Sequence, residues 1–488
     1  MENNNSNNNK PKLYHGRRPV TRREFLASGA IPMMSYMIPS ALMTTFAKAG
    51  IAQAQELCKI GEASKFPPIV NINANGGWWV AGNNIFLTEG RELLPSYGRN
   101  GLGSAANLVS QIVKTGHFKN QPPFYSGSGF LAGVQSGLVN GAASAALAKT
   151  NFVSMPLQSQ NDSDTNKLAP FYLLQKAGLS GKILPNLGRT DNGIGVSNAS
   201  AFGMSPAPLI VNNVDNIVNA LGVGDRLAQL NQVQKTNMFK ASQNLSFAQS
   251  RKLASLTGGS LLDRLLGQAN ADNTKLVENP AGLDLDPIMN AAFSAVWGLN
   301  ANTTKNSEDY INASLIYNAI NGNCGAVGIE VGGCDYHGST LAATIIKDTE
   351  IGTLTGKILQ SFAAMGSPGF IMINTDGSVG APPSDIPGTD PTADRGDSSG
   401  IYMMYYDPTD VVQAPDSQVG HMKSDPEAEA ADDKFLVGGN SEIATAAVFA
   451  NFLAASGKMN LWSAIPETSR TFDSLQLEKI LKFHGKAG

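Results

Sequence analysis

This chain has little net charge, few cysteines and no long apolar run beyond its N-terminal part. The 488 residues carry 36 Lys and Arg against 39 Asp and Glu, a net charge of −3, so the composition favours neither nucleic acid nor an anionic membrane as a partner. Only 15% of the residues are charged, while glycine occurs 51 times, which is typical of a loop-rich α/β protein rather than a helical bundle. No segment after residue 46 has the long apolar run that a membrane helix needs. The sequence therefore predicts no permanent membrane span in the mature chain.

The three cysteines, Cys58, Cys324 and Cys334, do not form a recognisable metal or redox motif. Cys324 and Cys334 flank the apolar run 326–331. If that run is a strand, its ends lie roughly 17 Å apart or more, whereas a disulfide needs Cα atoms within about 7 Å. We expect these two cysteines not to pair with each other and to be reduced, structural thiols, although Cys58 could reach either of them.

The N-terminal part of the chain predicts export. The sequence TRREFL at 21–26, with paired arginines before Phe-Leu, closely resembles the twin-arginine export consensus. A moderately apolar stretch, 25–46, follows, and Ala-Lys-Ala at 47–49 fits the small-x-small cleavage pattern. A membrane anchor is the alternative, but two prolines and a glycine leave this stretch weakly hydrophobic. We predict a twin-arginine signal peptide at 1–49, recognised by the export machinery, and a single exported or periplasmic domain at 50–488.

Short apolar runs between helical patterns predict an α/β fold. The strand 326–331, the amphipathic helix 338–366 and the strand 369–377 form a βαβ unit, which implies parallel pairing. These strands are continuously apolar rather than alternating, as in a sheet covered on both faces. We predict a mostly parallel sheet with helices on both faces and long loop insertions, one of them at 378–440, a region rich in Pro, Gly and Asp.

The remaining expected elements follow from the same periodicities. Further strands are predicted at 69–72, 151–157 and 208–211. Further helices are predicted at 105–113, 129–147, 171–177, 214–221, 226–250, 252–266, 287–299, 310–320 and 441–457.

Three of the predicted strands end in polar residues. Asn75 follows the first strand, Asp335 and His337 follow the central strand, and Asp376 follows the next. Ligands of open parallel sheets bind at the carboxyl ends of the strands, so these residues should meet at one edge. Carboxylate and amide oxygens suit hard cations, imidazole suits transition metals, and a divalent ion could activate water there. A purely structural alternative stays open, because an aspartate before a helix is also a good N-cap.

The residues GGCDYH at 332–337 resemble the Gly-Gly-x-Asp-Thr-His strand end of an exported, uncharacterised sulfatase-like group in the alkaline phosphatase and sulfatase superfamily. The twin-arginine motif and the segments 128–157, 371–379 and 438–457 are similar to parts of that group in the same order. The resemblance implies an alkaline-phosphatase-like fold. It also implies a set of Asp and His metal ligands, with hydrolysis of phosphate or sulfate esters as the activity.

The sequence departs from that group at several positions that would carry chemistry. Tyr336 stands in place of Thr, Thr-Asp-Gly-Ser at 375–378 in place of Glu-Phe-Gly-Arg, Asp397-Ser398 in place of Asp-His, and asparagine in place of the acidic residue after the first strand. Two hypotheses follow: a metal-dependent ester hydrolase with an eroded site, or a non-catalytic envelope protein that binds a partner through the same fold. The candidate ligands of a divalent metal ion are Asn75, Asp335, His337, Asp376 and Asp397.

Overall fold

The structure, a computed structural model, is described for residues 66–138, 143–158, 168–181, 184–190, 199–205, 208–215, 285–394, 398–423 and 437–485, and for a few isolated positions between 217 and 244. The proposed signal peptide and Cys58 lie outside these residues. A seven-stranded sheet in the order β10-β7-β11-β1-β12-β15-β6 forms the centre. Its strands are β1 (Ile69–Ala74), β6 (Thr150–Leu157), β7 (Leu184–Arg189), β10 (Leu209–Ile210), β11 (Cys324–Val331), β12 (Gly369–Asn374) and β15 (Ser399–Tyr406).

The sheet is mostly parallel, as the sequence predicted. Strands β10, β7, β11, β1 and β12 pair in parallel, and β15 pairs antiparallel with both β12 and β6. Every residue of β1, β6, β11, β12 and β15 is buried. Burial on both faces explains why these strands read as continuous apolar runs.

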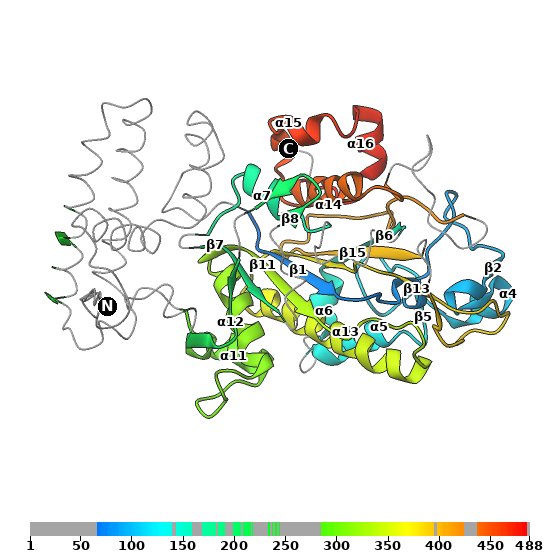
Figure 1. Ribbon diagram of the computed structural model, residues 1–488, viewed down its shortest axis with the longest axis horizontal. Helices are drawn as coiled ribbons and strands as arrows, with labels where there is room; N and C mark the ends of the chain where they lie inside the picture. Colours follow the sequence, from blue (N-terminus) through cyan, green and yellow to red (C-terminus); the bar gives the residue numbers. More distant parts are fainter. Residues whose placement is uncertain are drawn as a thin grey trace, which may run out of the picture.

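Helices cover both faces of the sheet, which Figure 1 shows as layers above and below the strands. One layer contains α5 (Gly129–Gly137), α6 (Ala143–Ala148), α11 (Ala291–Trp297), α12 (Glu308–Ile320) and α13 (Leu341–Ala364). The other contains α7 (Phe171–Lys176), α14 (Ser441–Ala455), α15 (Pro466–Ser469) and α16 (Ser474–Ile480). Two hydrophobic clusters result, and alternate residues of β1 divide between them: Val70 and Ile72 join the first, and Ile69 the second.

Helices α5 and α13 touch through their backbones. A Cβ placed on Gly133 of α5 would lie 2.3 Å from the carbonyl oxygen of Thr349, and one on Gly352 of α13 would lie 2.1 Å from that of Phe130. No side chain fits between the two helices at these positions, so the glycines are required by the close approach. The contact fixes α13, the helix that follows the Asp335–His337 loop, against α5.

The prediction of a long loop at 378–440 is wrong in one important part. It contains β15, a fully buried eight-residue strand in the central sheet, and a short pair formed by β13 (Val379–Gly380) and β14 (Ala393–Asp394). The run Ile-Tyr-Met-Met-Tyr-Tyr at 401–406 carried the strand signal, but the surrounding Pro, Gly and Asp residues concealed it. Strand β7 was likewise not predicted.

Most other helix and strand predictions are confirmed within a few residues, with three exceptions. The helix predicted at 287–299 is divided into the 3-10 helix η6 (Pro287–Met289) and α11. The helix predicted at 105–113 stops early: α4 (Ala105–Leu108) is followed by the 3-10 helix η3 (Val109–Gln111) and by β4 (Ile112–Val113). The helix predicted at 129–147 is divided into α5 and α6. The helices predicted at 214–221, 226–250 and 252–266 fall outside the described residues, apart from isolated positions.

Short elements complete the described chain. They are β2 (Ser96–Tyr97), β3 (Gly103–Ser104), β5 (Phe124–Tyr125), β8 (Ala199–Ser200), β9 (Gly203–Met204), η1 (Val80–Gly82), η2 (Gly98–Asn100), η6 (Pro287–Met289) and η7 (Met459–Leu461). Cys324 and Cys334 are both buried and free, as expected. Among the helices of the described residues, none is long and apolar enough to cross a membrane.

Candidate functional site

The turn after β1 is hydrogen-bonded to the turn after β11. The backbone N–H of Asn75 donates to the carbonyl oxygen of Val331 at 3.0 Å, and the N–H of Cys334 donates to the carbonyl oxygen of Asn75 at 3.1 Å. The Asn75 side chain is buried, and its Nδ2 donates to Oε1 of Glu330 at 2.9 Å. Asn75 therefore joins two neighbouring strand ends.

Gly76 is the point at which the ends of β1, β11 and β12 meet. Its N–H donates to Oδ1 of Asp376 at 2.7 Å, and a Cβ on it would lie 2.7 Å from both Cβ and N of Asp335. Its φ of 120° is in the region that favours glycine. A side chain at this position would separate Asp335 from the β1 turn. The predicted convergence of Asn75, Asp335 and Asp376 at one edge of the sheet is therefore observed.

Asp335 and His337 form a pair on the surface of this edge. Nδ1 of His337 lies 2.8 Å from Oδ1 of Asp335, and the two side chains are 55% and 52% exposed. Carboxylate oxygens and imidazole nitrogens are both metal-ligating atoms, so the pair supplies two side chains that can bind a metal ion. The two donors are of different types, a carboxylate and an imidazole, which is the combination that zinc and other transition metals accept.

Asp335 is not the N-cap of α13, so the structural alternative raised by the sequence is wrong. The N-cap is Thr340, whose hydroxyl accepts from the N–H of Ala343 at 3.4 Å. The carboxylate of Asp390 also accepts from the N–H of Leu341 at 2.7 Å. The α13 N-terminus is thus satisfied without Asp335, whose Oδ1 accepts instead from the backbone N–H of His337 at 3.4 Å.

Of the two remaining aspartates in the predicted ligand set, Asp376 lies among the described residues and Asp397 does not. Asp376 is buried, and its Oδ1 is used by the Gly76 N–H, so part of its role is to hold the β1 turn. Asp397 lies outside the described residues, and its place in the ligand set stays a prediction. In the described part of the chain, no group of three or more His, Cys, Asp or Glu side chains is arranged to hold a metal ion.

Buried polar side chains continue from this edge into the sheet. Asn71 and Asn73 occupy alternate positions of β1 and so share a face, and both are fully buried. Nδ2 of Asn374 on β12 donates to Oδ1 of Asn73 at 3.0 Å, and Glu330 on β11 is also fully buried. Neither amide atom of Asn71 has a hydrogen-bond partner. Core positions at the centre of a sheet are ordinarily apolar, so this polar row marks the carboxyl half of the central strands as unlike the rest of the core.

A buried carboxylate beneath the loop was not identified from the sequence. Asp348 of α13 is 2% exposed, and its Oδ1 accepts from Nε1 of Trp78 at 2.6 Å and from the hydroxyl of Tyr336 at 2.9 Å. Its Oδ2 accepts from Nδ2 of Asn83 at 2.9 Å. Burial raises the pKa of Asp348 to about 6, although the three hydrogen bonds oppose the shift.

A sequence signal for Asp348 existed in the helical periodicity. Thr344, Asp348, Ile351 and Thr355 recur at spacings of four and three, and all four are buried. An aspartate on the buried stripe of a helix requires hydrogen-bond donors from elsewhere in the fold. Trp78, one of these donors, is itself fully buried in the core.

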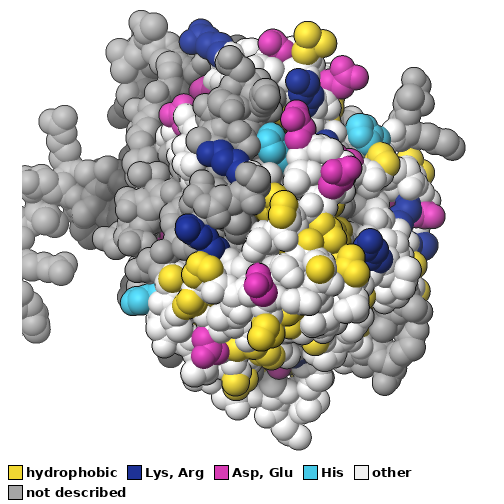
Figure 2. Space-filling view, turned by 90° about the vertical axis from the view of Figure 1, so that its right-hand side faces the viewer, with side chains coloured by type: hydrophobic (Ala, Val, Ile, Leu, Met, Phe, Trp, Pro, Cys, Tyr) yellow, Lys and Arg dark blue, Asp and Glu magenta, His cyan; other side chains and the backbone are white. Residues whose placement is uncertain are grey.

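The carboxyl edge of the sheet lies on the right-hand side of Figure 1 and faces the viewer in Figure 2. On this face the basic and acidic side chains are interspersed with hydrophobic ones rather than gathered by sign. The visible described surface therefore offers no strong field of one sign that would attract a polyanion.

Comparisons with known proteins add no relative. No family model matches the chain, and no curated protein matches it.

Proposed function

We propose that the protein is an exported α/β protein of the alkaline phosphatase and sulfatase type, and that the edge around Gly76 is the reduced site of a metal-dependent phosphate or sulfate ester hydrolase. The observation that carries the proposal is the meeting of three strand ends at Gly76, which puts Asn75, Asp335 and Asp376 side by side. Carboxyl edges of parallel strands are where such folds bind ligands.

The described donor set fits a divalent ion only in part. Asp335 and His337 would supply one carboxylate and one imidazole, whereas catalytic zinc sites have three protein ligands. Asp376 and the predicted Asp397 are the candidates for the third. When bound, such an ion would lower the pKa of a water molecule and polarise an ester oxygen. With a shortened ligand set we expect weak metal affinity and slow turnover.

The second candidate is a non-catalytic envelope protein that binds a partner at the same edge. Two observations favour it. Tyr336, which replaces the threonine of the resembling group, is buried and hydrogen-bonded to Asp348, and one oxygen of Asp376 is used within the protein. Both residues therefore serve the structure of the edge in addition to any chemistry.

Metal content and ester hydrolysis separate the two candidates. The protein purified from its native host should contain a stoichiometric divalent metal and should cleave a chromogenic phosphate or sulfate ester. Asp335→Ala and His337→Ala should each lower turnover by about 100-fold or more, as expected for loss of a metal ligand. Matched controls are Asp215→Ala, which removes an exposed carboxylate paired with Lys305, and His484→Ala, at an exposed histidine. If neither metal nor turnover is detected, the hydrolase proposal fails and the binding protein remains.

Export is tested separately. Replacing both Arg22 and Arg23 by lysine should leave the precursor in the cytoplasm, because the paired arginines are the feature that the export machinery recognises. Unchanged export of that variant would remove this part of the proposal.

A further inference from the structure

The loop between β11 and α13 places consecutive side chains on opposite sides. Asp335 and His337 are about half exposed, while Tyr336 between them is 2% exposed. Gly333 and Gly338 bracket the three residues with φ of 73° and 72°, and a Cβ on Gly338 would meet nothing within 4 Å. A Cβ on Gly333 would meet only the end of the Lys347 side chain, at 3.7 Å. Glycines of positive φ at both ends give the loop little rigidity of its own, so its conformation depends on its two buried side chains, Cys334 and Tyr336.

Tyr336 is held by the carboxylate of Asp348, and the same carboxylate holds the segment after β1. The Oδ1 atom of Asp348 accepts from both the Tyr336 hydroxyl and the Trp78 indole, and Asn83 binds Oδ2. Asn83 in turn accepts from the hydroxyl of Ser128, the N-cap of α5, at 2.7 Å. One carboxylate thus connects the loop, the β1 turn and the start of α5.

We propose that Asp348 is a positioning residue for the Asp335–His337 pair, because its buried carboxylate fixes Tyr336 and Trp78 relative to one another and thereby sets both exposed side chains at the edge of the sheet. The chemical role of the pair rests on the proposed function; the positioning does not. Loss of the carboxylate, or of the Tyr336 hydroxyl, should release the loop while leaving the sheet in place.

Among the residues that the structure describes, no cation bonds to Asp348. The donors that reach it are an indole, a phenol and an amide, and Tyr402 of β15 is the titratable group that faces it from the sheet. The charges of Cys334 in the loop and of Glu350 on α13 both contribute to raising the pKa of Tyr336. The α5 segment GFLAGVQSG, whose Gly129 packs on the Cβ of Asp348, carries no charge. Protonation of Asp348 would therefore weaken its hydrogen bonds without compensation from a charged neighbour.

The first test is amide hydrogen exchange of the full chain, read on the peptide that covers residues 332–340. In Tyr336→Phe, exchange at 335–338 should accelerate by about tenfold or more, as expected for the loss of a hydrogen bond to a charged group. Exchange in β6 and in the second half of α13 should not change. The matched control is Tyr402→Phe, which removes a buried hydroxyl that donates to the carbonyl oxygen of Val80 at 2.7 Å. An unchanged loop in Tyr336→Phe, or equal acceleration in the control or throughout the chain, would overturn the proposal.

The second test follows the Trp78 indole N–H by NMR as a function of pH. In the wild type its resonance should shift with a midpoint near the raised pKa of Asp348, about 6, and the shift should be absent in Asp348→Asn. Should that variant not fold, Tyr336→Phe supplies the answer, because loss of a hydrogen bond that lowers the pKa should move the midpoint upward. An indole signal that does not titrate in the wild type contradicts the proposal. Neither test requires metal or substrate, so a missing hydrolase activity would not be mistaken for a missing positioning role.

Discussion

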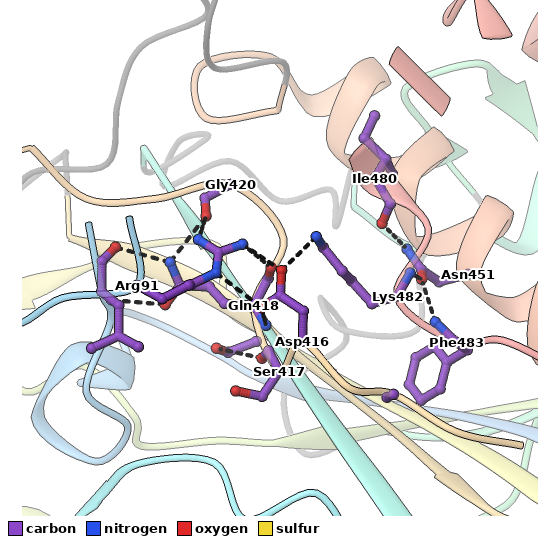
Figure 3. A network of polar contacts seen from close by, with 12 residues as sticks. Arg91, Asp416, Ser417, Gln418, Gly420, Asn451, Ile480, Lys482 and Phe483 are labelled. Atoms are coloured by element: carbon purple, nitrogen blue, oxygen red, sulfur yellow. Dashed lines mark hydrogen bonds and ion pairs between the residues drawn. The ribbon is translucent and has the colours of Figure 1, made fainter. Parts of the chain in front are cut away.

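Two carboxylates, Asp348 and Asp416, each join distant segments of this chain, the first through neutral hydrogen-bond donors and the second through cations. Asp348 accepts from three neutral donors, and burial raises its pKa to about 6. Asp416 is also partly desolvated, which by itself would raise its pKa, but the Arg91 guanidinium and the Lys482 ammonium outweigh burial and hold the pKa below its ordinary value. Arg91 binds Asp416 with Nε at 2.9 Å and Nη2 at 2.7 Å, and Lys482 binds at 2.6 Å (Figure 3).

The difference shows how the partners of a carboxylate decide what it can do. Because the two cations lower the pKa of Asp416, its carboxylate stays ionised below the pH at which a free aspartate takes up a proton. It connects the loop at Arg91 to the C-terminal segment at Lys482. The backbone N–H of Lys482 also donates to Oδ1 of Asn451 at 2.8 Å. Asp348, with neutral donors, changes protonation near neutral pH. The first arrangement is a permanent connection, and the second can respond to its surroundings.

The largest expected loss in the free energy of unfolding is that of Asp348→Ala. The change leaves the Trp78 indole, the Tyr336 hydroxyl and the Asn83 amide buried without their acceptor, and each such group costs about 1–3 kcal/mol. We expect the free energy of unfolding to fall by at least about 3 kcal/mol in urea denaturation. Asp348→Asn, which keeps one acceptor oxygen, should lose less. A loss below about 1 kcal/mol in the alanine variant would show that the three donors find other partners.

Asp416→Ala should cost less, about 2 kcal/mol, although it removes two ion pairs. The Asp416 and Arg91 side chains are 34% and 31% exposed, and solvent screening weakens pairs that are partly exposed. Asp215→Ala is the control, since its pair with Lys305 is half exposed on both sides and should contribute about 0.5 kcal/mol or less. Equal losses in the two variants would remove the distinction between the Asp416 network and an ordinary surface pair.

The pH dependence of stability should have opposite signs at the two sites. Because the pKa of Asp348 is higher in the folded than in the unfolded chain, the folded state binds the proton more tightly, and the contribution of this group falls as pH rises through about 6. The stability of the wild type relative to Asp348→Asn should drop by roughly 1.4 kcal/mol between about pH 5 and about pH 7.5. Relative to Asp416→Asn it should instead drop as pH falls below about 4, because the pKa of Asp416 is depressed. A flat difference for Asp348 would contradict its raised pKa.

The smallest effect is expected at the exposed pair. Asp335→Ala and His337→Ala should each change the free energy of unfolding by about 0.5 kcal/mol or less, since the pair is half exposed. Thermal unfolding of the two variants beside the wild type measures this. A large loss in either would mean that the pair supports the fold, and would weaken its assignment to a binding site.

The sequence predicted the parts of the fold that combine length with a clear period. Strands β1, β11 and β12 and helix α13 were located because apolar runs and a long amphipathic stretch alternate there. The common edge of Asn75, Asp335 and Asp376 followed from parallel pairing alone. Strand β15 was missed because propensity is read locally, and the residues around it favour loops.

The candidate site was predictable only in its exposed part. Asp335 and His337 stand in a motif that can be seen in one short stretch. Two of the three partners of Asp348, Trp78 and Asn83, are more than 250 residues away from it along the chain. No local pattern indicates which distant donors will surround a buried carboxylate. The need for glycine at position 76 is equally non-local, because a side chain there would collide with Asp335, which is far away along the chain.

The glycines between α5 and α13 have a mechanical consequence. They recur every four residues, at 129, 133 and 137 in one helix and at 352 and 356 in the other, so a slide of one helical turn would bring Asp348 or Gln360 to a position where the opposing backbone leaves no room. The close backbone contact therefore permits only one register of α5 against α13. Any adjustment of this edge of the sheet therefore falls to the short glycine-flanked loop rather than to the two helices.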